Sequence, residues 1–235
     1  MIIQGVTLKG VDVYDASFNS NGALLYVDAG NSASYPGTGT AWTDLSENSN
    51  NATLVNSPSY TASPGYFTFN GLGSNYASTT ASKFNTTYTG KTVFVAARMT
   101  AVIAGAFRCL FGTNSGTRNF NTYIYSPSSG VYQIHYSAGG SGGFSNNLSF
   151  TTNQWAIFTV THTTGGLVTY YQNGVAVGTN TGITFGQYAS NGGEFIGLGD
   201  NYWYGDIAMC AVYGRALSSD EIKQNFNALK TRYGL

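Results

Sequence analysis

The last thirty residues of the chain constrain its fold more than any other segment, because they join a fully apolar strand to a capped helix. Residues 205–213 read Gly-Asp-Ile-Ala-Met-Cys-Ala-Val-Tyr, and apolar side chains occupy both alternating positions after the aspartate. A strand that is apolar on both faces is normally covered on both faces. The sequence therefore predicts a sheet with further layers of protein on either side.

A helix follows this strand after the short sequence Gly-Arg-Ala-Leu. Ser218 and Glu221 have the spacing of a capping box, in which each side chain bonds the backbone of the other residue. Gly234 stands where a left-handed residue commonly ends a helix. One helix face is apolar, which predicts packing on the sheet. The apolar stripe consists of Ile222, Phe226 and Leu229, and the solvent-facing residues include Lys223, Lys230 and Arg232.

The preceding chain alternates short apolar runs with Gly, Asn, Ser and Pro and shows no helical period. This pattern predicts an all-β sandwich. The Asn-Gly pair at 173–174 predicts a type I′ hairpin, and the Gly- and Ser-rich stretch 137–145 is expected to be a flexible loop at a hairpin tip. The predicted strands are 23–28, 66–70, 92–98, 107–112, 121–125, 131–136, 155–162, 167–172, 175–178, 194–198 and 206–213.

Several motifs together resemble one known domain family. They are G-D-I-A (205–208), R-A-L-S (215–218), E-I (221–222), W-T-D-L-S (42–46) and F-T-F-N-G (67–71). This set resembles the laminin-G-like, concanavalin A-like jelly-roll domains of the type found in bacteriophage structural proteins. The resemblance implies a sandwich of two antiparallel sheets with one short C-terminal helix. Glu47 and Ala52 stand where relatives usually carry glycine, so the local turn is expected to differ.

The chain is long enough, at 235 residues, for one large β domain with its own core. The resemblance covers residues 22–235, and residues 1–21 are predicted to be a separate N-terminal segment. Two interpretations of that segment stay open. It is either an additional edge strand of the sandwich or an extended arm that reaches a neighbouring subunit.

Charged residues make up only 9% of the chain, and the formal net charge is zero. The sequence therefore lacks the basic surface on which binding to nucleic acid or to an anionic membrane depends. No secretory signal is visible, and no stretch is long enough to span a membrane. A virion protein, made in the host cytoplasm and released by lysis, fits this combination, and we expect that location.

Glycoside hydrolases occur in the concanavalin A-like fold, so an enzyme has to be considered. Retaining hydrolysis needs two carboxylates about 5 Å apart, which on one strand means acidic residues at alternating positions. Neither Glu47 nor Glu194 has an acidic residue two or four positions later, and Glu221 belongs to the helix cap. His135 and His162 lie in predicted strands without a G-x-S-x-G motif. We therefore expect no catalytic residue and no enzyme.

Cys109 and Cys210 lie in apolar segments and are expected to be buried thiols rather than a disulfide. Related domains often bind calcium at a loop edge through aspartate, asparagine and carbonyl oxygens. The eligible residues are Asp28, Asp44, Asp200 and Asn201. Because they form no dense acidic loop, roles in capping turns are favoured. No metal and no other cofactor is expected.

Aromatic residues in loops are the best ligand candidates, because sugar rings stack on aromatic planes while polar side chains bond the hydroxyl groups. The candidate glycan site consists of Asp200, Asn201, Tyr202 and Tyr204. Trp203, between them, is expected in the core by resemblance to related domains. Trp42 is likewise expected to be structural.

We expect a non-enzymatic structural or decoration protein of a bacteriophage particle, on capsid or tail, with weak glycan binding through its loops. Its partners would be other virion proteins, in a homo-oligomeric or multicopy arrangement, and a glycan of the host surface. The alternative is a secreted or cell-surface carbohydrate-binding lectin module. A third interpretation is a glycoside hydrolase whose carboxylates converge from distant strands.

Overall fold

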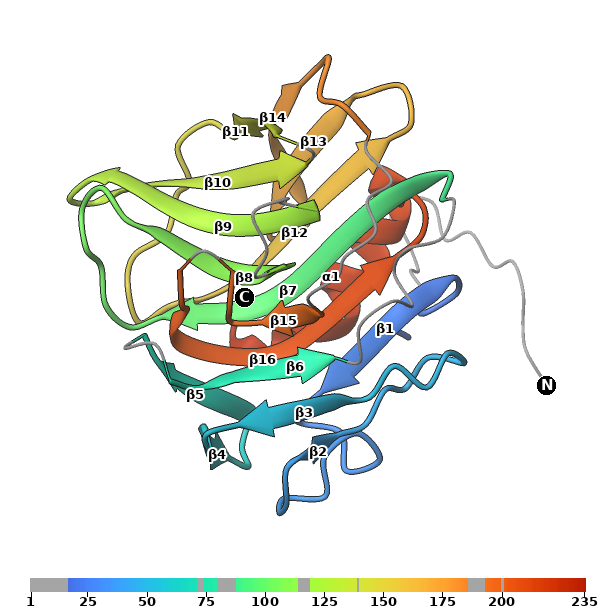
Figure 1. Ribbon diagram of the computed structural model, residues 1–235, viewed down its shortest axis with the longest axis vertical. Helices are drawn as coiled ribbons and strands as arrows, with labels where there is room; N and C mark the ends of the chain where they lie inside the picture. The colour runs from blue at the N-terminus through green and yellow to red at the C-terminus, as the bar shows by residue number, and fades with distance from the viewer. Residues whose placement is uncertain are drawn as a thin grey trace, which may run out of the picture.

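The computed structural model describes residues 17–71, 74–79, 88–113, 119–138, 140–185, 193–199 and 201–235. Within these ranges the chain forms two antiparallel sheets of eight strands each and one helix. This is the predicted β-sandwich with a C-terminal helix (Figure 1). Most of the predicted N-terminal segment, residues 1–16, lies outside the described ranges.

Sheet A is built around the apolar strand near the C-terminus. In spatial order its strands are β14 (Val175–Asn180), β13 (Val168–Gln172), β12 (Trp155–Thr163), β7 (Gly90–Met99), β16 (Tyr204–Tyr213), β5 (Tyr66–Asn70) and β4 (Ser59–Thr61), while β1 (Ala23–Asp28) also pairs with β16. β7 lines one edge of β16, and β5 and β1 share the other edge, with β5 on residues 204–207 and β1 on residues 209–213. Every residue of β16 after Tyr204 is therefore buried, as the sequence predicts.

Sheet B packs against sheet A, and no helix of the described ranges covers its other face. In spatial order its strands are β11 (Ser141–Phe144), β10 (Val131–Ala138), β9 (Asn119–Ser128), β8 (Phe107–Thr113), β15 (Glu194–Ile196), β6 (Tyr76–Thr79), β3 (Ala52–Val55) and β2 (Ala41–Trp42). Ile124 and Ile134 are direct partners in the β9–β10 ladder and both are fully buried between the sheets. Their neighbours in sequence consequently lie on the outer face of sheet B.

The main core fills the space between the two sheets. Trp42 and Trp203 are both fully buried there, which confirms the structural roles predicted for them. Phe67 contacts Trp42 edge to face, with ring centroids 4.8 Å apart. Cys109 and Cys210 are buried free thiols, as predicted.

The outer face of sheet A is covered by α1 (Ser219–Tyr233), which forms a second apolar layer with β7, β12 and β16 (Figure 1). Ile222 and Leu229 are buried in this layer, while Phe226 is partly buried at its edge. The layer explains why both pleat faces of β16 are apolar. Within the described part of the chain, no helix combines the length and the apolar character that crossing a membrane requires.

The predicted capping box is present at the start of α1. Ser218 Oγ accepts the backbone N–H of Glu221 at 3.3 Å, and Glu221 Oε2 accepts the backbone N–H of Ser218 at 2.9 Å. Arg215 donates two further hydrogen bonds to the Glu221 carboxylate, at 2.7 and 2.8 Å. Gly234 ends the helix with φ at +69°.

Residues 17–22 lie against this helix. The backbone N–H of Asn19 donates to Asn225 Oδ1 at 2.7 Å, and the carbonyl of Asn19 accepts from Tyr213 Oη at 2.6 Å. Gln224 Nε2 donates to the carbonyl of Ser17 at 3.2 Å. The described end of the N-terminal segment is thus attached to the sandwich.

The Gly- and Ser-rich stretch 137–145 was the least accurate prediction, because most of it is strand. β10 continues to Ala138, and β11 pairs with it from His135 to Ala138. Glycine packs closely here: a Cβ on Gly143 would lie only 3.0 Å from Tyr170 Oη. Backbone bonding and a close neighbour on β13 hold this edge strand, and side-chain alternation does not reveal either.

Four short strands, β2, β3, β4 and β6, were also not predicted. Each has four residues or fewer, so an alternating pattern has little length in which to appear. The predicted Asn-Gly hairpin is confirmed between β13 and β14, with φ at +51° for Asn173 and +76° for Gly174.

Candidate functional site

The three glutamates considered for catalysis lie on three separate elements. Glu47 is exposed in the turn after β2, Glu221 caps α1, and Glu194 is 1% exposed on β15. Burial raises the pKa of Glu194 to about 8, so its carboxyl holds a proton at neutral pH. Burial lowers the pKa of nearby Lys91 in the same way. The Lys91 ammonium lies over the ring of Phe120, inside the sandwich.

His162 is fully enclosed and bonded on both ring nitrogens. Nδ1 lies 3.0 Å from Tyr136 Oη, and Nε2 lies 3.2 Å from the carbonyl oxygen of Ile183. Burial lowers the pKa of this imidazole, which favours its neutral form. The predicted structural role of His162 is confirmed.

Asp28 and Asp44, two of the three aspartates considered for calcium, bond the backbone and an arginine. The Asp44 carboxylate accepts four hydrogen bonds, from the backbone N–H groups of Tyr26, Ser46 and Asn50 and from Ser46 Oγ. Asp28 accepts the backbone N–H of Gly30 and two bonds from Arg232, at 2.5 and 2.8 Å. Their predicted turn roles are confirmed. Across the described ranges, no group of three or more His, Cys, Asp or Glu side chains could hold a metal ion.

The structure describes three of the four residues that the sequence predicts for a glycan site. Asp200 lies outside the described residues, and Asn201 is exposed. Trp203 is fully buried and donates its indole N–H to the carbonyl of Asp206 at 3.3 Å. Tyr202 and Tyr204 on either side of it are partly buried, and Tyr204 begins β16 with its ring packed over Gly71. They flank a core tryptophan and do not form an open aromatic platform.

A larger aromatic surface lies on the outer face of sheet B. We call it the aromatic face, and it consists of Phe107 (β8), Tyr123 and Tyr125 (β9), His135 (β10) and Phe144 (β11). Phe107 and Tyr125 stack with centroids 4.3 Å apart and planes 20° apart. His135 lies 5.1 Å from Phe107 and 4.4 Å from Phe144. The rings thus form one continuous cluster across four strands.

Strand register explains this gathering. Phe107 is the partner of Tyr125, Tyr123 is the partner of His135, and His135 is the partner of Phe144. Direct partners in antiparallel strands share one face of the sheet. Because the buried pair of Ile124 and Ile134 points inward, all five rings point outward.

Four of the five rings of the aromatic face are at least partly exposed, and within the described residues no helix covers sheet B. Phe144 is 41% exposed, and Phe107, Tyr125 and His135 are each partly exposed. Only Tyr123 is buried, at 2% exposed. Gly199 closes over it: a Cβ on this glycine would lie 3.4 Å from Tyr123 Oη and still closer to Cys109. The loop that carries Asn201 and Tyr202 therefore borders the aromatic face.

Polar groups lie beside the rings. Gln133 is the register partner of Tyr125 and is partly exposed on the same face. Its side-chain amide donates to the carbonyl of Ser145 at 3.2 Å, which fixes its position. Exposed Gly142 lies next to Phe144, so ligand atoms could approach the backbone there. Flat apolar rings with nearby amide and hydroxyl groups are suited to binding a sugar.

Reasoning from the sequence missed this surface. The sequence places His135 in a predicted strand without a catalytic motif, and Phe144 falls in the stretch 137–145 that is predicted to be a flexible loop. One signal was available: Tyr123 and Tyr125 alternate with the apolar Ile124, so the face opposite the core carries rings. Outward aromatic residues on a strand need either a covering layer or a binding role.

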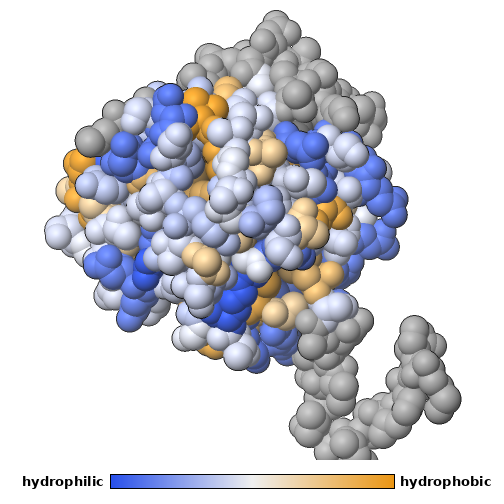
Figure 2. Space-filling model, turned by 90° about the horizontal axis from the view of Figure 1, so that it is seen from below, coloured by the Kyte–Doolittle hydropathy of each residue, from blue (hydrophilic) through white to orange (hydrophobic). Residues whose placement is uncertain are grey.

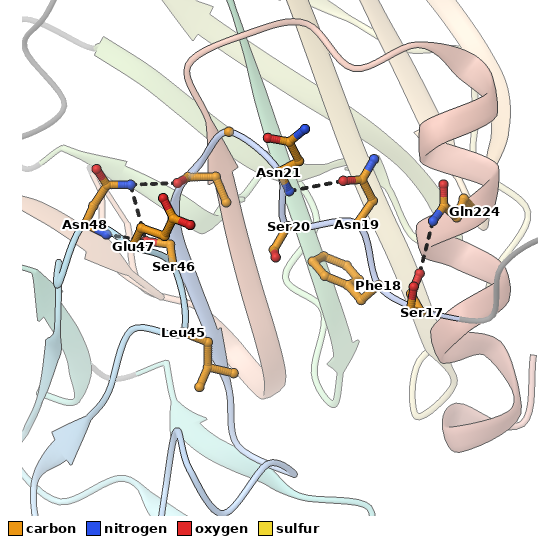
Figure 3. A pocket seen from close by; sticks show the side chains of 12 residues that line it. Ser17, Phe18, Asn19, Ser20, Asn21, Leu45, Ser46, Glu47, Asn48 and Gln224 are labelled. Carbon is orange, nitrogen blue, oxygen red and sulfur yellow. Dashed lines mark hydrogen bonds between the residues drawn. The ribbon is translucent and has the colours of Figure 1, made fainter. Parts of the chain in front are cut away.

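A cleft of about 770 Å³ lies elsewhere, between residues 17–23, the turn 45–48 and α1 (Figure 3). Its polar side chains largely bond one another or nearby backbone: Asn48 donates to the carbonyl of Ala23 at 2.8 Å, and Asn19 Oδ1 accepts from the backbone of Asn21. Its ring, Phe18, stacks on Tyr26 with centroids 4.5 Å apart. The cleft therefore presents no free aromatic plane to a ligand.

The family of the chain can now be stated. Residues 70–223, more than half of the sequence, match a laminin-G-like family model described as the concanavalin A-like lectin/glucanases superfamily. The chain belongs to this superfamily, as the sequence motifs suggested. A search of the curated proteins found no match.

Solved structures agree on the fold. Domain 4 of an extracellular GH43 arabinanase from Geobacillus stearothermophilus, solved with arabinotriose, superposes with a TM-score of 0.65 at 14% identity, covering 86% of this chain and 97% of that one. A structure of botulinum neurotoxin type C, a toxin described as entering cells through two ganglioside molecules, superposes with a TM-score of 0.66 at 14% identity. The match covers 89% of this chain and 52% of the toxin chain. Trypanosoma rangeli sialidase in complex with sialic acid superposes with a TM-score of 0.66 at 16% identity, covering 98% of this chain and 36% of the sialidase chain. This chain thus spans about half of the toxin chain and about a third of the sialidase.

Proposed function

We propose that this protein is a non-catalytic carbohydrate-binding domain and that sugar rings stack on the aromatic face of sheet B. The observation that carries the proposal is the cluster itself: five rings from four strands, four of them partly open to solvent, on a sheet face that no described helix covers. A domain of this size normally buries such rings or uses them.

The comparisons support the proposal at the level of the fold. Structures of similar fold were solved with arabinotriose or with sialic acid, and a third title names gangliosides. Their identities of 14–16% do not carry over any residue. The chemistry proposed for this chain therefore rests on its own rings and on Gln133.

Binding at a single site is expected to be weak. The face offers ring planes and few free hydrogen-bonding groups, because the Gln133 amide is already bonded to Ser145. Stacking on an aromatic ring contributes on the order of 1 kcal/mol per contact. Useful affinity would then come from several copies acting together.

The direct test is a binding screen of neutral oligosaccharides followed by titration of variants. Phe144→Ala and Tyr125→Ala should each weaken binding about tenfold, which corresponds to about 1.4 kcal/mol. Phe226→Ala is the matched control, because Phe226 is also partly buried but lies on α1. Equal loss in all three variants, or retention of affinity in the first two, would contradict the proposal.

We further propose that the domain is carried in multiple copies on a bacteriophage particle, bound to other virion proteins and facing a host glycan. The sequence motifs and the low charge support this placement. Mass spectrometry of purified particles should detect the protein at a fixed copy number. Detection only in the secreted fraction, with none in particles, would favour the alternative of a secreted lectin.

The absence of catalysis is part of the same proposal. Of the three glutamates considered for catalysis, Glu194 is the one on a strand. It is enclosed between the sheets, where burial raises its pKa and favours the protonated form. Oligosaccharides that bind should be recovered unchanged after long incubation. Hydrolysis that disappears in Glu194→Gln would show an enzyme instead.

A further inference from the structure

Arg108 differs from the other arginines whose side chains the structure describes. Arg98 pairs with Asp206, Arg215 with Glu221 and Arg232 with Asp28, all with N–O distances of 2.5–2.7 Å. Arg108 has no carboxylate partner among the described residues. Its only described hydrogen bond runs from Nη1 to the carbonyl oxygen of Tyr202, at 3.3 Å.

The Arg108 side chain is also the most deeply buried arginine of the four. The residue is 9% exposed, and its Nε–H has no acceptor among the residues that the structure describes. Burial lowers the pKa of the guanidinium, which nevertheless remains charged at any physiological pH. Enclosing a charge without an opposite charge is costly unless another group compensates it.

Arg108 lies at the end of the sandwich where the loop with Tyr202 meets β16. It pairs with Ile124 in the ladder, so it points away from the aromatic face although Phe107 precedes it on β8. Tyr202 supplies the carbonyl that it bonds, and Tyr204 lies close enough to interact with its charge. Two of the residues predicted from the sequence as ligand contacts therefore surround the uncompensated guanidinium.

We propose that Arg108, together with Tyr202 and Tyr204, forms a subsite for a carboxylate group, such as that of an acidic sugar. A planar guanidinium with a free Nε–H presents the parallel donors that match a carboxylate. Tyr202 bonds the guanidinium through its backbone carbonyl, and Tyr204 lies close enough to interact with its charge, so both residues border the subsite. That the carboxylate belongs to a sugar rests on the proposed function, whereas the anion subsite itself does not.

The test observes the Nε–H signals of the arginines by nuclear magnetic resonance in the intact chain. Sodium glucuronate should shift the Arg108 signal in a saturable way, while glucose and sodium chloride at the same ionic strength should not. Arg98 is the internal control, because its Nε–H already donates to Asp206 at 2.7 Å. Arg108→Lys and Arg108→Gln should weaken glucuronate binding about tenfold or more.

Other outcomes separate the two proposals. A neutral oligosaccharide that binds the aromatic face while glucuronate leaves Arg108 unshifted would overturn the anion subsite alone. Glucuronate binding at Arg108 without any neutral sugar binding would overturn the proposed function alone. Asp200 lies outside the described residues, so Asp200→Asn is tested as well. If this variant shifts the Arg108 signal without ligand and only then allows glucuronate to bind, Asp200 is the natural counter-charge and the subsite is refuted.

Discussion

The two outer faces of the sandwich differ in what covers them. On sheet A, β7, β12 and β16 carry a set of outward apolar side chains, and α1 buries this set in a second core layer. On sheet B the outward side chains of β8 to β11 are rings with polar neighbours, and solvent reaches them. Among the described residues, one sheet face is thus packed under a helix, and the other carries partly exposed rings.

The contrast shows how aromatic residues can be assigned a role. Trp155 on sheet A contacts Tyr233 of α1 at 4.9 Å, so its ring serves the packing of the helix. The described ring contacts of Phe144 on sheet B are all with rings of the aromatic face. Elsewhere, as seen from below in Figure 2, hydrophobic residues are scattered among polar ones rather than gathered in one broad patch.

The largest expected difference concerns stability. Ile222→Ala removes a fully buried side chain from the layer under α1 and should lower the free energy of unfolding by about 2–4 kcal/mol. Phe144→Ala, on the open face, should lower it by less than about 1 kcal/mol. Urea denaturation of both variants measures this. Equal losses of unfolding free energy would mean that the aromatic face is part of the core. That result would contradict the difference between the two outer faces.

A smaller effect follows from the ion pair that holds the start of α1. The hydrogen bonds from Arg215 lower the pKa of Glu221 from 4.5 to about 2. A carboxylate with a lowered pKa stabilises the folded state fully above pH 4.5, and this contribution is lost as the pH falls toward 2. Because Glu221 is about a quarter exposed, solvent screening reduces the contribution to about 1–2 kcal/mol.

Stability curves between pH 2 and pH 7 test this prediction. The difference between the wild type and Glu221→Gln should be greatest near neutral pH and should vanish toward pH 2. A difference that stays constant over this range would show that the charge of Glu221 contributes nothing and that only its geometry matters. Binding of a neutral sugar to sheet B should be the same in both proteins wherever both are folded.

The smallest effect concerns the helix cap alone. Ser218→Ala removes one side of the capping box and should cost about 1 kcal/mol of stability. Ser219→Ala, one residue later and equally exposed, is the matched control and should cost almost nothing. Thermal unfolding measures both. A larger loss for Ser219→Ala would place the start of the helix one residue away from the position described above.

The sequence predicts much of this fold because its main elements are locally encoded. β16 shows apolar residues on both faces, α1 shows its cap and its stripe, and Asn173 with Gly174 encodes a turn. β11 could not be predicted in the same way, since glycine-rich strands are defined by the neighbour they bond and not by their own pattern. The paired register of β10 and β11 is a property of two segments together.

The candidate site was harder to predict for a similar reason. Phe107 and Phe144 are separated by 37 positions, and only the β8–β9–β10–β11 order brings their rings together. Tyr202 and Tyr204 stand two positions apart in the sequence, which makes them conspicuous, yet the buried Trp203 between them shows that this stretch mainly closes the core. The sequence does not single out Arg108, because only the folded structure shows which arginine has no carboxylate partner among the described residues.

The central claim, that the open face of sheet B binds sugar, is tested most directly by mapping chemical shifts in the intact protein during titration with a neutral oligosaccharide found in the binding screen. The proposed function predicts saturable shifts at Phe107, Tyr125, His135 and Phe144, and none at Ile222 or Leu229 on the covered face. Shifts confined to the cleft between residues 17–23 and 45–48, or to α1, would contradict it.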